Sequence, residues 1–318
     1  MVELKRDTPL FIVLNVGSGH GDAEIAKNTI AEILSAAGQA HEFVLVERAD
    51  DLKRLAQSAV EKAQLQRGAV IAAGGDGTIN AVAQAVLPSG VPFGVLPQGT
   101  FNYFGRTHGI PTETGTSAQA LLNATVTPVQ VGLVNERIFL VNASIGLYPQ
   151  VLEDRELYKS RFGRFRLVAL WSGLMTLLRG YPQLRLLIER DGGKVENLHT
   201  PTVFAGNNRL QLEQIGIPEA VAQPQGFLVA VTPRPVSRWA MLGLIARGIR
   251  GKLGAANTVD SFEFKTLRVR NRFGMHRRIK VATDGEIVWL DMPLIFRVSP
   301  QPLHLLMPAA ADKVVEQA

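Results

Sequence analysis

The sequence predicts an α/β domain followed by an antiparallel β domain. Over the first 128 residues, short apolar runs alternate with helix-like stretches, the pattern of a parallel sheet with helices on both faces. Three of these runs end in polar loops that contain glycine. From about residue 129 the chain changes to closely spaced apolar runs with few helices between them, which is typical of an antiparallel sandwich. We therefore expect domains at 1–128 and 129–307, and a tail at 308–318 that packs back on the first domain.

Composition restricts the class of protein. Of the 318 residues, 46% are hydrophobic and 19% charged, as in a globular protein with a buried core. There is no cysteine, which excludes disulfides and cysteine-rich zinc sites and agrees with a cytoplasmic location. The longest apolar run, Leu167–Leu178, is too short to span a bilayer, and the N-terminus has no hydrophobic signal core. The formal charge of +6 favours phosphates or an anionic membrane surface as partners, and without a nucleic-acid motif no nucleic acid is expected.

The first domain is expected to be built from repeated strand–helix units. Leu10–Val16 is a clean buried strand, and it leads through a glycine-rich turn into a helix that ends at Gly38. Further strands are expected at 42–46, 69–73 and 91–96, with helices after the first two of these. In such a sheet ligands bind beyond the carboxyl ends of the strands.

The stretch Gly74–Asn80 (GGDGTIN) joins a buried strand to a helix. Its glycines allow the backbone to approach a ligand, and a helix N-terminus attracts anions. Thr78 and Asn80 are expected to cap the first amides of the helix. A carboxylate in this setting, Asp76, makes sense if a bound metal offsets its charge. Taken alone, the motif is equally compatible with an ordinary glycine-rich turn.

Three loops are expected to meet at one edge of the sheet. Asn15–Gly19, Gly74–Asn80 and Gly99–Asn102 each follow a predicted strand, and the carboxyl ends of parallel strands share one edge. This convergence favours a ligand that carries phosphate.

The second domain is expected to consist mainly of strands. They are placed at 129–133, 137–142, 184–189, 202–205, 227–232, 261–269, 278–282 and 294–298, with helical stretches at about 160–179 and 237–250. Sheet edges in this domain could pair two subunits into a homodimer.

With these loops placed, the sequence resembles the diacylglycerol kinase catalytic-domain family, lipid kinases that include bacterial diacylglycerol, phosphatidylglycerol and sphingosine-type kinases. The likeness rests on the first loop at 15–19, the signature at 74–80, the third loop Gly99–Arg106 with Gly109-Ile110-Pro111, the stretch 142–149, and Asp284-Gly285-Glu286. Gly-Gly-Asp-Gly-Thr also occurs in NAD kinases and phosphofructokinases, but the third loop and the late Asp-Gly-Glu favour the lipid kinases. The resemblance implies a three-layer, Rossmann-like parallel sheet of the NAD-kinase/phosphofructokinase type, followed by a β-sandwich that binds the lipid.

The resemblance also implies the site residues. Asp76 would organise the Mg²⁺ that accompanies ATP, and Glu286 would accept the proton of the lipid hydroxyl. Asp-Gly is also a common hairpin turn, so the last motif has a purely structural alternative. The residues expected around the nucleotide are Asn15, Ser18, Gly19, Gly74, Gly75, Asp76, Gly77, Thr78, Ile79, Asn80, Gly99, Thr100 and Asn102.

The sequence departs from the family at several positions. His20 stands where a lysine or arginine is common, and Tyr103 and Gln130 stand where many members have an acid of the magnesium network. Gln225 replaces the aspartate of the structural magnesium site, and an amide is a poor ligand for this hard cation. We therefore expect that structural magnesium to be absent. The same substitutions motivate the alternative that catalysis is weak or differently tuned.

Basic residues near aromatic ones suggest how a lipid is reached. Arginines flank aromatic and aliphatic residues at 161–179 and 234–252, and a third basic run lies at 265–280. Amphipathic helices of this kind suit an anionic membrane surface, although helices that simply pack on the sheet are the commoner outcome. The expectation is an ATP-dependent lipid kinase of phospholipid metabolism, cytoplasmic and transiently membrane-associated. The alternatives are a soluble kinase of the NAD-kinase type and a nucleotide- or lipid-binding homologue with weakened catalysis.

Overall fold

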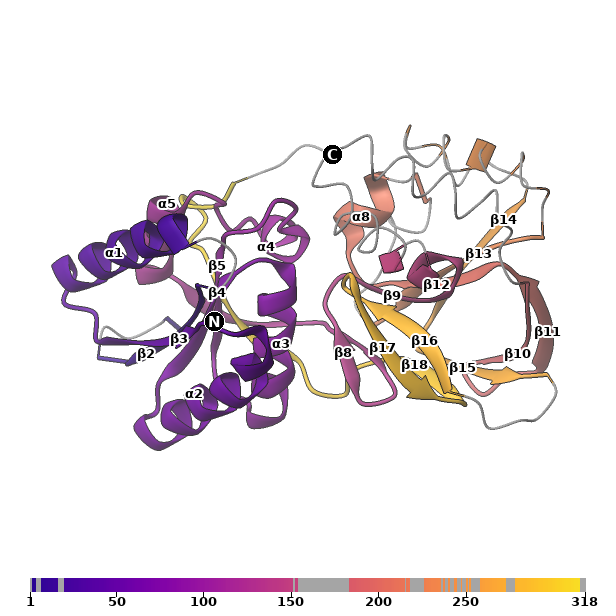
Figure 1. Ribbon diagram of the computed structural model, residues 1–318, viewed down its shortest axis with the longest axis horizontal. Coiled ribbons are helices and arrows are strands. Elements are labelled where there is room, and N and C mark those ends of the chain that lie inside the picture. The colour runs from indigo at the N-terminus through magenta and orange to yellow at the C-terminus, as the bar shows by residue number, and fades with distance from the viewer. Residues whose placement is uncertain are drawn as a thin grey trace. The chain divides into compact units, whose positions relative to one another are not determined.

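The chain folds into two compact units. The computed structural model describes residues 2–3, 7–16, 20–150, 152–153, 183–214, 216–217, 226–235, 237, 240, 243–244, 247, 250, 252, 258–272 and 278–314. The first unit contains Met1–Val131 and Ser299–Gln317, and the second contains Gly132–Val298 (Figure 1). None of the helices in the described ranges is long and apolar enough to cross a membrane.

The first unit is built on a seven-stranded sheet with the strand order β1-β6-β19-β5-β4-β2-β3. The pairs β2–β3, β2–β4, β4–β5 and β5–β19 are parallel. The strands are β1 (Val2–Glu3), β2 (Leu10–Asn15), β3 (His41–Val46), β4 (Ala69–Gly74), β5 (Phe93–Pro97), β6 (Thr125–Val129) and β19 (Leu303–Met307). The helices are α1 (His20–Ala36), η1 (Ala49–Asp51), α2 (Leu52–Gln66), α3 (Asp76–Val86), η2 (Leu87–Ser89), α4 (Tyr103–Thr107) and α5 (Thr114–Leu122).

Helices cover both faces of this sheet, as Figure 1 shows. One face packs Leu10, Ile12 and Ile71 against Ile30 of α1 and Leu121 of α5. Helices α2 and α3 cover the other face and contact each other as well as β2 and β4. Because both faces are covered, the central strands are almost wholly apolar, which explains why they read as continuous hydrophobic runs. The three-layer α/β prediction is confirmed.

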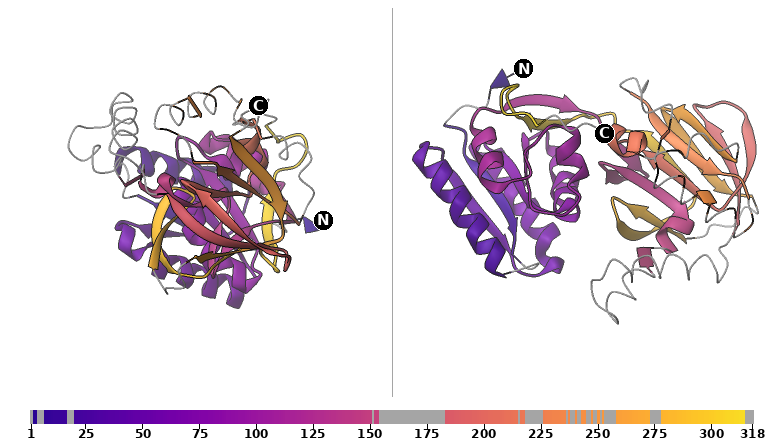
Figure 2. Two further views of the ribbon diagram at one scale, coloured as in Figure 1. Left: turned by 90° about the vertical axis from the view of Figure 1, so that its right-hand side faces the viewer. Right: turned by 90° about the horizontal axis from the view of Figure 1, so that it is seen from above.

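The last strand of the chain belongs to the first unit. Strand β19 pairs parallel with β5 and antiparallel with β6, and it appears in yellow beside β6 in the right-hand view of Figure 2. The second unit therefore ends at Val298, whereas the sequence placed its end at 307. A five-residue apolar run has no local feature that tells which sheet it will join. The tail beyond it contacts the same unit, since the Val314 N–H donates to the Gly109 carbonyl at 3.1 Å.

The second unit is a sandwich of two six-stranded sheets whose strand pairs are antiparallel. Their orders are β11-β10-β15-β18-β7-β8 and β14-β13-β12-β9-β16-β17. The first sheet consists of β7 (Gly132–Val134), β8 (Arg137–Phe139), β10 (Leu184–Arg190), β11 (Val195–Thr200), β15 (Thr266–Asn271) and β18 (Leu294–Val298). The second consists of β9 (Asn142–Gly146), β12 (Thr202–Gly206), β13 (Leu228–Pro233), β14 (Val259–Phe264), β16 (Arg278–Thr283) and β17 (Glu286–Asp291), and the short helix α8 (Arg209–Gln214) follows β12.

Both sheets contribute to one core, as expected for a sandwich. Ile188 and Leu267 of one sheet pack with Ile145, Val203 and Val281 of the other. The single strand predicted at 261–269 is wrong, because the chain leaves one sheet at Phe264 and enters the other at Thr266. The single strand predicted at 137–142 is wrong for the same reason, because β8 and β9 belong to different sheets. Strands β11 and β17 were not among the predicted strands. The predicted helix at 160–179 lies outside the described residues, and only isolated residues of 237–250 are described.

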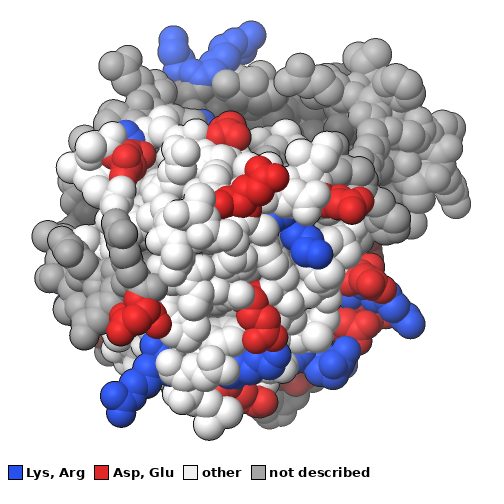
Figure 3. Space-filling model, turned by 90° about the vertical axis from the view of Figure 1, so that its left-hand side faces the viewer, with Lys and Arg blue, Asp and Glu red and all other residues white. Residues whose placement is uncertain are grey.

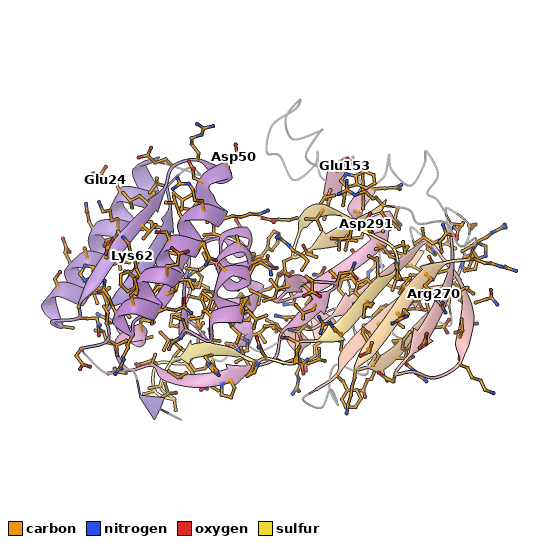
Figure 4. All side chains as sticks on the ribbon, turned by 90° about the horizontal axis from the view of Figure 1, so that it is seen from below. Glu24, Asp50, Lys62, Glu153, Arg270 and Asp291 are labelled. Carbon is orange, nitrogen blue, oxygen red and sulfur yellow. The ribbon has the colours of Figure 1, made fainter. Side chains whose placement is uncertain are left out.

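Folding brings acidic partners to the basic run at 265–280. Arg270 lies 3.9 Å from Glu189, Arg278 lies 3.8 Å from Asp291, and the Lys280 ammonium pairs with Glu153 at 2.5 Å. Arg270, Asp291 and Glu153 are labelled on the second unit in Figure 4. On the face of the first unit in Figure 3, acidic and basic side chains are interspersed. The positive charge of the basic run is thus partly neutralised by acidic residues from other segments, so the sequence of the run alone does not indicate it.

The stability of the first unit should depend on pH through His108, which follows α4. Burial, with a smaller effect of Lys313, lowers the pKa of His108 from 6.5 to about 4. The unfolded chain therefore binds this proton at a higher pH than the folded one, so stability falls as the pH drops from about 6.5 to about 4. We expect His108→Gln to remove up to about 3 kcal/mol of this dependence. Urea unfolding midpoints measured between about pH 4 and pH 8 check it, and the same pH dependence in both proteins would contradict it.

Candidate functional site

The three predicted loops meet at one cavity of the first unit. The cavity has a volume of about 340 Å³, and Asn15, Gly74, Gly75 and Gly99 line it. Sequence reasoning missed its other lining residues, which come from the first turns of α1, the end of β5 and the approach to α5: Ala23, Ala26, Pro97, Gln98, Thr112 and Thr114. Ser18 and Gly19 lie outside the described residues.

The glycines of these loops are required by close packing. A Cβ atom on Gly99 would lie 2.9 Å from the Gly75 Cα atom, and one on Gly74 would lie 2.8 Å from the Thr78 Cβ atom. Neither distance is tolerated by real side chains, so the third loop can approach the signature loop only with glycine at 99, and the turn into α3 requires glycine at 74. The backbone is thereby brought to the cavity wall without an intervening side chain.

Within the part of the chain that the structure describes, the N-cap position of α3 makes no side-chain capping hydrogen bond. The N-cap residue is Gly75, and the predicted capping by Thr78 and Asn80 is wrong, because both residues are buried within the helix. The Thr78 hydroxyl instead accepts a hydrogen bond from the Asn15 amide at 3.1 Å, which ties the first loop to the signature. The first amides of α3 are left open to an anionic ligand. Ile79, expected near the nucleotide, is fully buried in the core.

Asp76 is held at the start of α3 by the third loop. Its Oδ2 atom accepts a hydrogen bond from the Asn102 N–H at 3.0 Å. Its buried Oδ1 atom has no hydrogen-bond partner in the described part of the chain. Burial raises the pKa of Asp76, against the opposing effects of the Asn102 and Tyr103 N–H groups and the Arg106 charge. A buried, unpaired carboxylate oxygen is costly, and a cation or a bound donor would satisfy it.

Asn102 shapes the third loop. It has a positive φ of 49°, and its side chain exchanges two hydrogen bonds with Gly99: the Gly99 N–H donates to Oδ1 at 2.9 Å, and Nδ2 donates to the Gly99 carbonyl at 2.8 Å. Its side chain is therefore engaged in holding Gly99 at the cavity and its N–H in holding Asp76. Thr100 is exposed beside it.

The Asp-Gly-Glu motif lies in the second unit, at the turn between β16 and β17. Asp284 and Gly285 have positive φ angles of 48° and 87°, and Thr283 pairs with Glu286 across the turn, so the predicted hairpin is also present. The Asp284 carboxylate accepts hydrogen bonds from the N–H groups of Leu140, Val141 and Asn142 at 2.7, 2.8 and 2.9 Å. The turn is thereby fastened to the segment that enters β9.

Glu286 is half-exposed at the first position of β17. Arg137 donates from Nη2 to its Oε2 atom at 2.9 Å, and the two side chains are 14% and 45% exposed, respectively. Neither Arg137 nor Asp284 was among the predicted site residues. The family motif marked the position of Asp284, but no local signal marks Arg137.

A second cavity, of about 500 Å³, lies in the second unit. Leu184, Leu186, Ile279, Trp289 and Met292 give it an apolar lining, and Arg185, Arg278, Lys280 and Glu153 are the charged residues around it. Such a combination suits an amphipathic molecule with an anionic or polar end.

Comparison with known proteins identifies relatives of this chain. The family model described as the diacylglycerol kinase catalytic domain matches residues 9–134. A diacylglycerol kinase from Staphylococcus aureus (strain JH9) is 30% identical over 245 residues, which cover 69% of this chain and 75% of that protein. One from Bacillus subtilis (strain 168) is 33% identical over 146 residues, 45% of this chain and 47% of its own length, so the match spans about half of that relative.

A solved structure shares the fold. The crystal structure of a diacylglycerol kinase from Bacillus anthracis str. Sterne superimposes with a TM-score of 0.67 at 20% identity, over 96% of this chain and 99% of that one. At this identity, the likeness concerns the arrangement of the two units' elements alone.

Proposed function

The chain belongs to the diacylglycerol kinase catalytic-domain family, and on that premise we propose that it transfers the γ-phosphate of Mg-ATP to a hydroxyl of a diacylglycerol-like membrane lipid. The observation that carries this proposal is the cavity where three loops converge on the uncapped N-terminus of α3, next to a buried carboxylate with an unpaired oxygen. Phosphoryl transfer depends mainly on positioning and on neutralising charge. The loops would position the phosphates, and the N-terminus of α3 together with a cation held by Asp76 would offset their charge.

The first unit would bind the nucleotide. The amides of Gly74–Thr78 would hold phosphate oxygens, and Asn15, Gly99 and Thr100 would surround the rest of the nucleotide. The unpaired Oδ1 atom of Asp76 fits a magnesium ion or one of its waters. No group of three or more acidic or histidine side chains gathers in the described residues, so the ion would rest on Asp76 together with the phosphates. Magnesium, when bound, offsets the charge of the phosphates.

Glu286 would act as the general base. As the lipid hydroxyl oxygen bonds to the γ-phosphorus, the bond to the ADP oxygen breaks and the hydroxyl proton passes to the Glu286 carboxylate. A half-exposed carboxylate at the tip of a fixed hairpin is accessible to a substrate that approaches from outside.

The lipid would be met at a membrane surface. The apolar cavity of the second unit supports an acceptor with acyl chains. Basic residues at 234–252 and 265–280 would contact an anionic bilayer. Their attraction to it would be weakened where Arg270, Arg278 and Lys280 are paired with acidic side chains. We propose a protein that works in the cytoplasm, docks transiently on membranes and pairs sheet edges if it dimerises.

The direct test is transfer of labelled γ-phosphate from ATP to vesicles of total bacterial lipid extract. We expect a labelled, chloroform-soluble product whose formation falls about 10²–10⁴-fold in Glu286→Gln, the usual contribution of a general base. Glu196→Gln is the matched control, since Glu196 is an exposed glutamate on β11 of the same unit. An equal loss in both variants, or none in Glu286→Gln, would refute the role of Glu286.

The same assay separates the alternatives. Label that appears only when NAD replaces the lipid would indicate a kinase of the NAD-kinase type. ATP binding without transfer to either acceptor would indicate a homologue with weakened catalysis. The loss of activity would then be attributed first to Tyr103 and Gln130, which replace acids of the family.

A further inference from the structure

We propose that Arg137 is a positioning residue that orients the Glu286 carboxylate for proton transfer. The inference rests on the proposed function, because it gives Arg137 a role through Glu286. It identifies a contributor that no motif of the sequence marks.

The Arg137–Glu286 pair bridges the two sheets of the sandwich. Strand β8, which begins at Arg137, is the last strand of one sheet, and β17, which begins at Glu286, is the last strand of the other. Their side chains meet across this edge, with 2.9 Å between Arg137 Nη2 and Glu286 Oε2. The Glu286 side chain is therefore held by a residue of the opposite sheet and not by its own hairpin.

The contact fixes one carboxylate oxygen and leaves the other open. Oε1 of Glu286 has no hydrogen bond within the described ranges, and Oε2 is held by the guanidinium. A glutamate with 45% exposure would otherwise sample several rotamers, and general-base catalysis depends on placing the acceptor oxygen within hydrogen-bond reach of the substrate. An anchored Oε2 leaves Oε1 as the proton acceptor in a defined direction.

The burial of Arg137 sets it apart from an ordinary surface ion pair. Its side chain is only 14% exposed, and its Nε–H is buried with no hydrogen-bond partner among the residues that the structure describes. A buried donor without a partner reduces the stability of the folded protein. Stability alone therefore does not explain why an arginine stands at position 137. A buried polar group without a partner calls for an explanation, and a role in catalysis is one.

The surrounding backbone holds both partners in place without the ion pair. Asp284 binds the N–H groups of Leu140–Asn142, just after β8, and Asn135 Nδ2 donates to the Asp291 carbonyl at the end of β17 at 3.2 Å. The hairpin containing β8 is thus joined to β17 near both of its ends. The Arg137–Glu286 ion pair is therefore not needed to hold the hairpin in place, and its effect is to orient the Glu286 side chain.

The test compares Arg137→Gln, Arg137→Lys, Glu286→Gln and the double variant Arg137→Gln/Glu286→Gln in the vesicle assay. We expect Arg137→Gln to lower kcat about 10–100-fold, with little change in the KM for ATP, and Arg137→Lys to recover part of the loss because it keeps a cationic donor. The double variant should be no slower than Glu286→Gln alone, since Arg137 acts only through that carboxylate. Arg297→Gln is the matched control, because Arg297 forms a 3.3 Å pair with Glu136 in the same unit.

The outcomes separate this inference from the proposed function. Transfer that depends on Glu286 but is unaffected by Arg137→Gln, or effects of the two substitutions that simply multiply, would overturn the inference alone. Loss of kcat in Arg137→Gln that matches its loss of folded protein, measured by thermal unfolding, would do the same. Absence of any transfer that depends on Glu286 would overturn both.

Discussion

Replacing Asp76 with asparagine should stabilise the ligand-free protein and at the same time abolish phosphoryl transfer. Burial raises the pKa of Asp76, so its charged form is less favourable in the folded than in the unfolded chain at neutral pH. An amide oxygen can still accept the Asn102 N–H, which now bonds Oδ2 at 3.0 Å. We expect a melting temperature higher by about 2–4 °C, the effect of about 1 kcal/mol in a domain of 150–250 residues. Transfer should fall at least about 10²–10³-fold, as when a preorganised charge is removed from an active site.

The two effects have separate readouts. Thermal unfolding with EDTA gives the stability of the ligand-free protein, and ATP with magnesium should raise the melting temperature of the wild type but not of Asp76→Asn. The stability difference should shrink as the pH falls, because protonated aspartate resembles asparagine. Asp50→Asn, at an exposed aspartate of η1 in the same unit, should change neither property. A lower melting temperature for Asp76→Asn at neutral pH would contradict the expectation.

Replacing Asp284 with alanine should unfold the Asp-Gly-Glu turn although Glu286 is intact. Three backbone N–H groups, those of Leu140, Val141 and Asn142, would lose their acceptor. Hydrogen bonds to a charged group contribute about 1.5–3 kcal/mol each, so we expect the loss of all three to cost about 4.5–9 kcal/mol. The melting transition of the second unit should fall by at least about 10 °C, and lipid phosphorylation should be lost.

A second variant isolates the hydrogen bonds from the backbone angle. Asp284 has a φ of 48°, which asparagine adopts easily and alanine does not. Asp284→Asn keeps one acceptor oxygen and should lose less stability than Asp284→Ala. Nucleotide binding, measured by calorimetry, should be unchanged in both, because Asp284 lies outside the first unit. Full stability in Asp284→Ala would show that the three contacts do not hold the turn.

The first unit could be predicted well because its signals are local. Leu10–Asn15, Ala69–Gly74 and Phe93–Pro97 are covered on both faces, so burial appears directly as unbroken apolar sequence. Their loops were placed at one edge by the rule for parallel strands, and Asn15, Gly74, Gly75 and Gly99 do line a single cavity. Even here the cap of α3 was wrong, because burial of Thr78 and Asn80 overrides their preference for helix ends.

The two-unit architecture, the converging loops and the position of the Asp-Gly-Glu turn could all be predicted from the chain, since each depends on periodicity or on residues close together in the sequence. Three contacts could be found only in the folded molecule: β19 returns to the first sheet, Asp284 binds residues 140–142, and Arg137 meets Glu286 across 149 positions. These contacts depend on which sheet each strand joins and on the order of strands within it. Sheet membership and strand order depend on how all the strands pack together, so they cannot be predicted from any single segment.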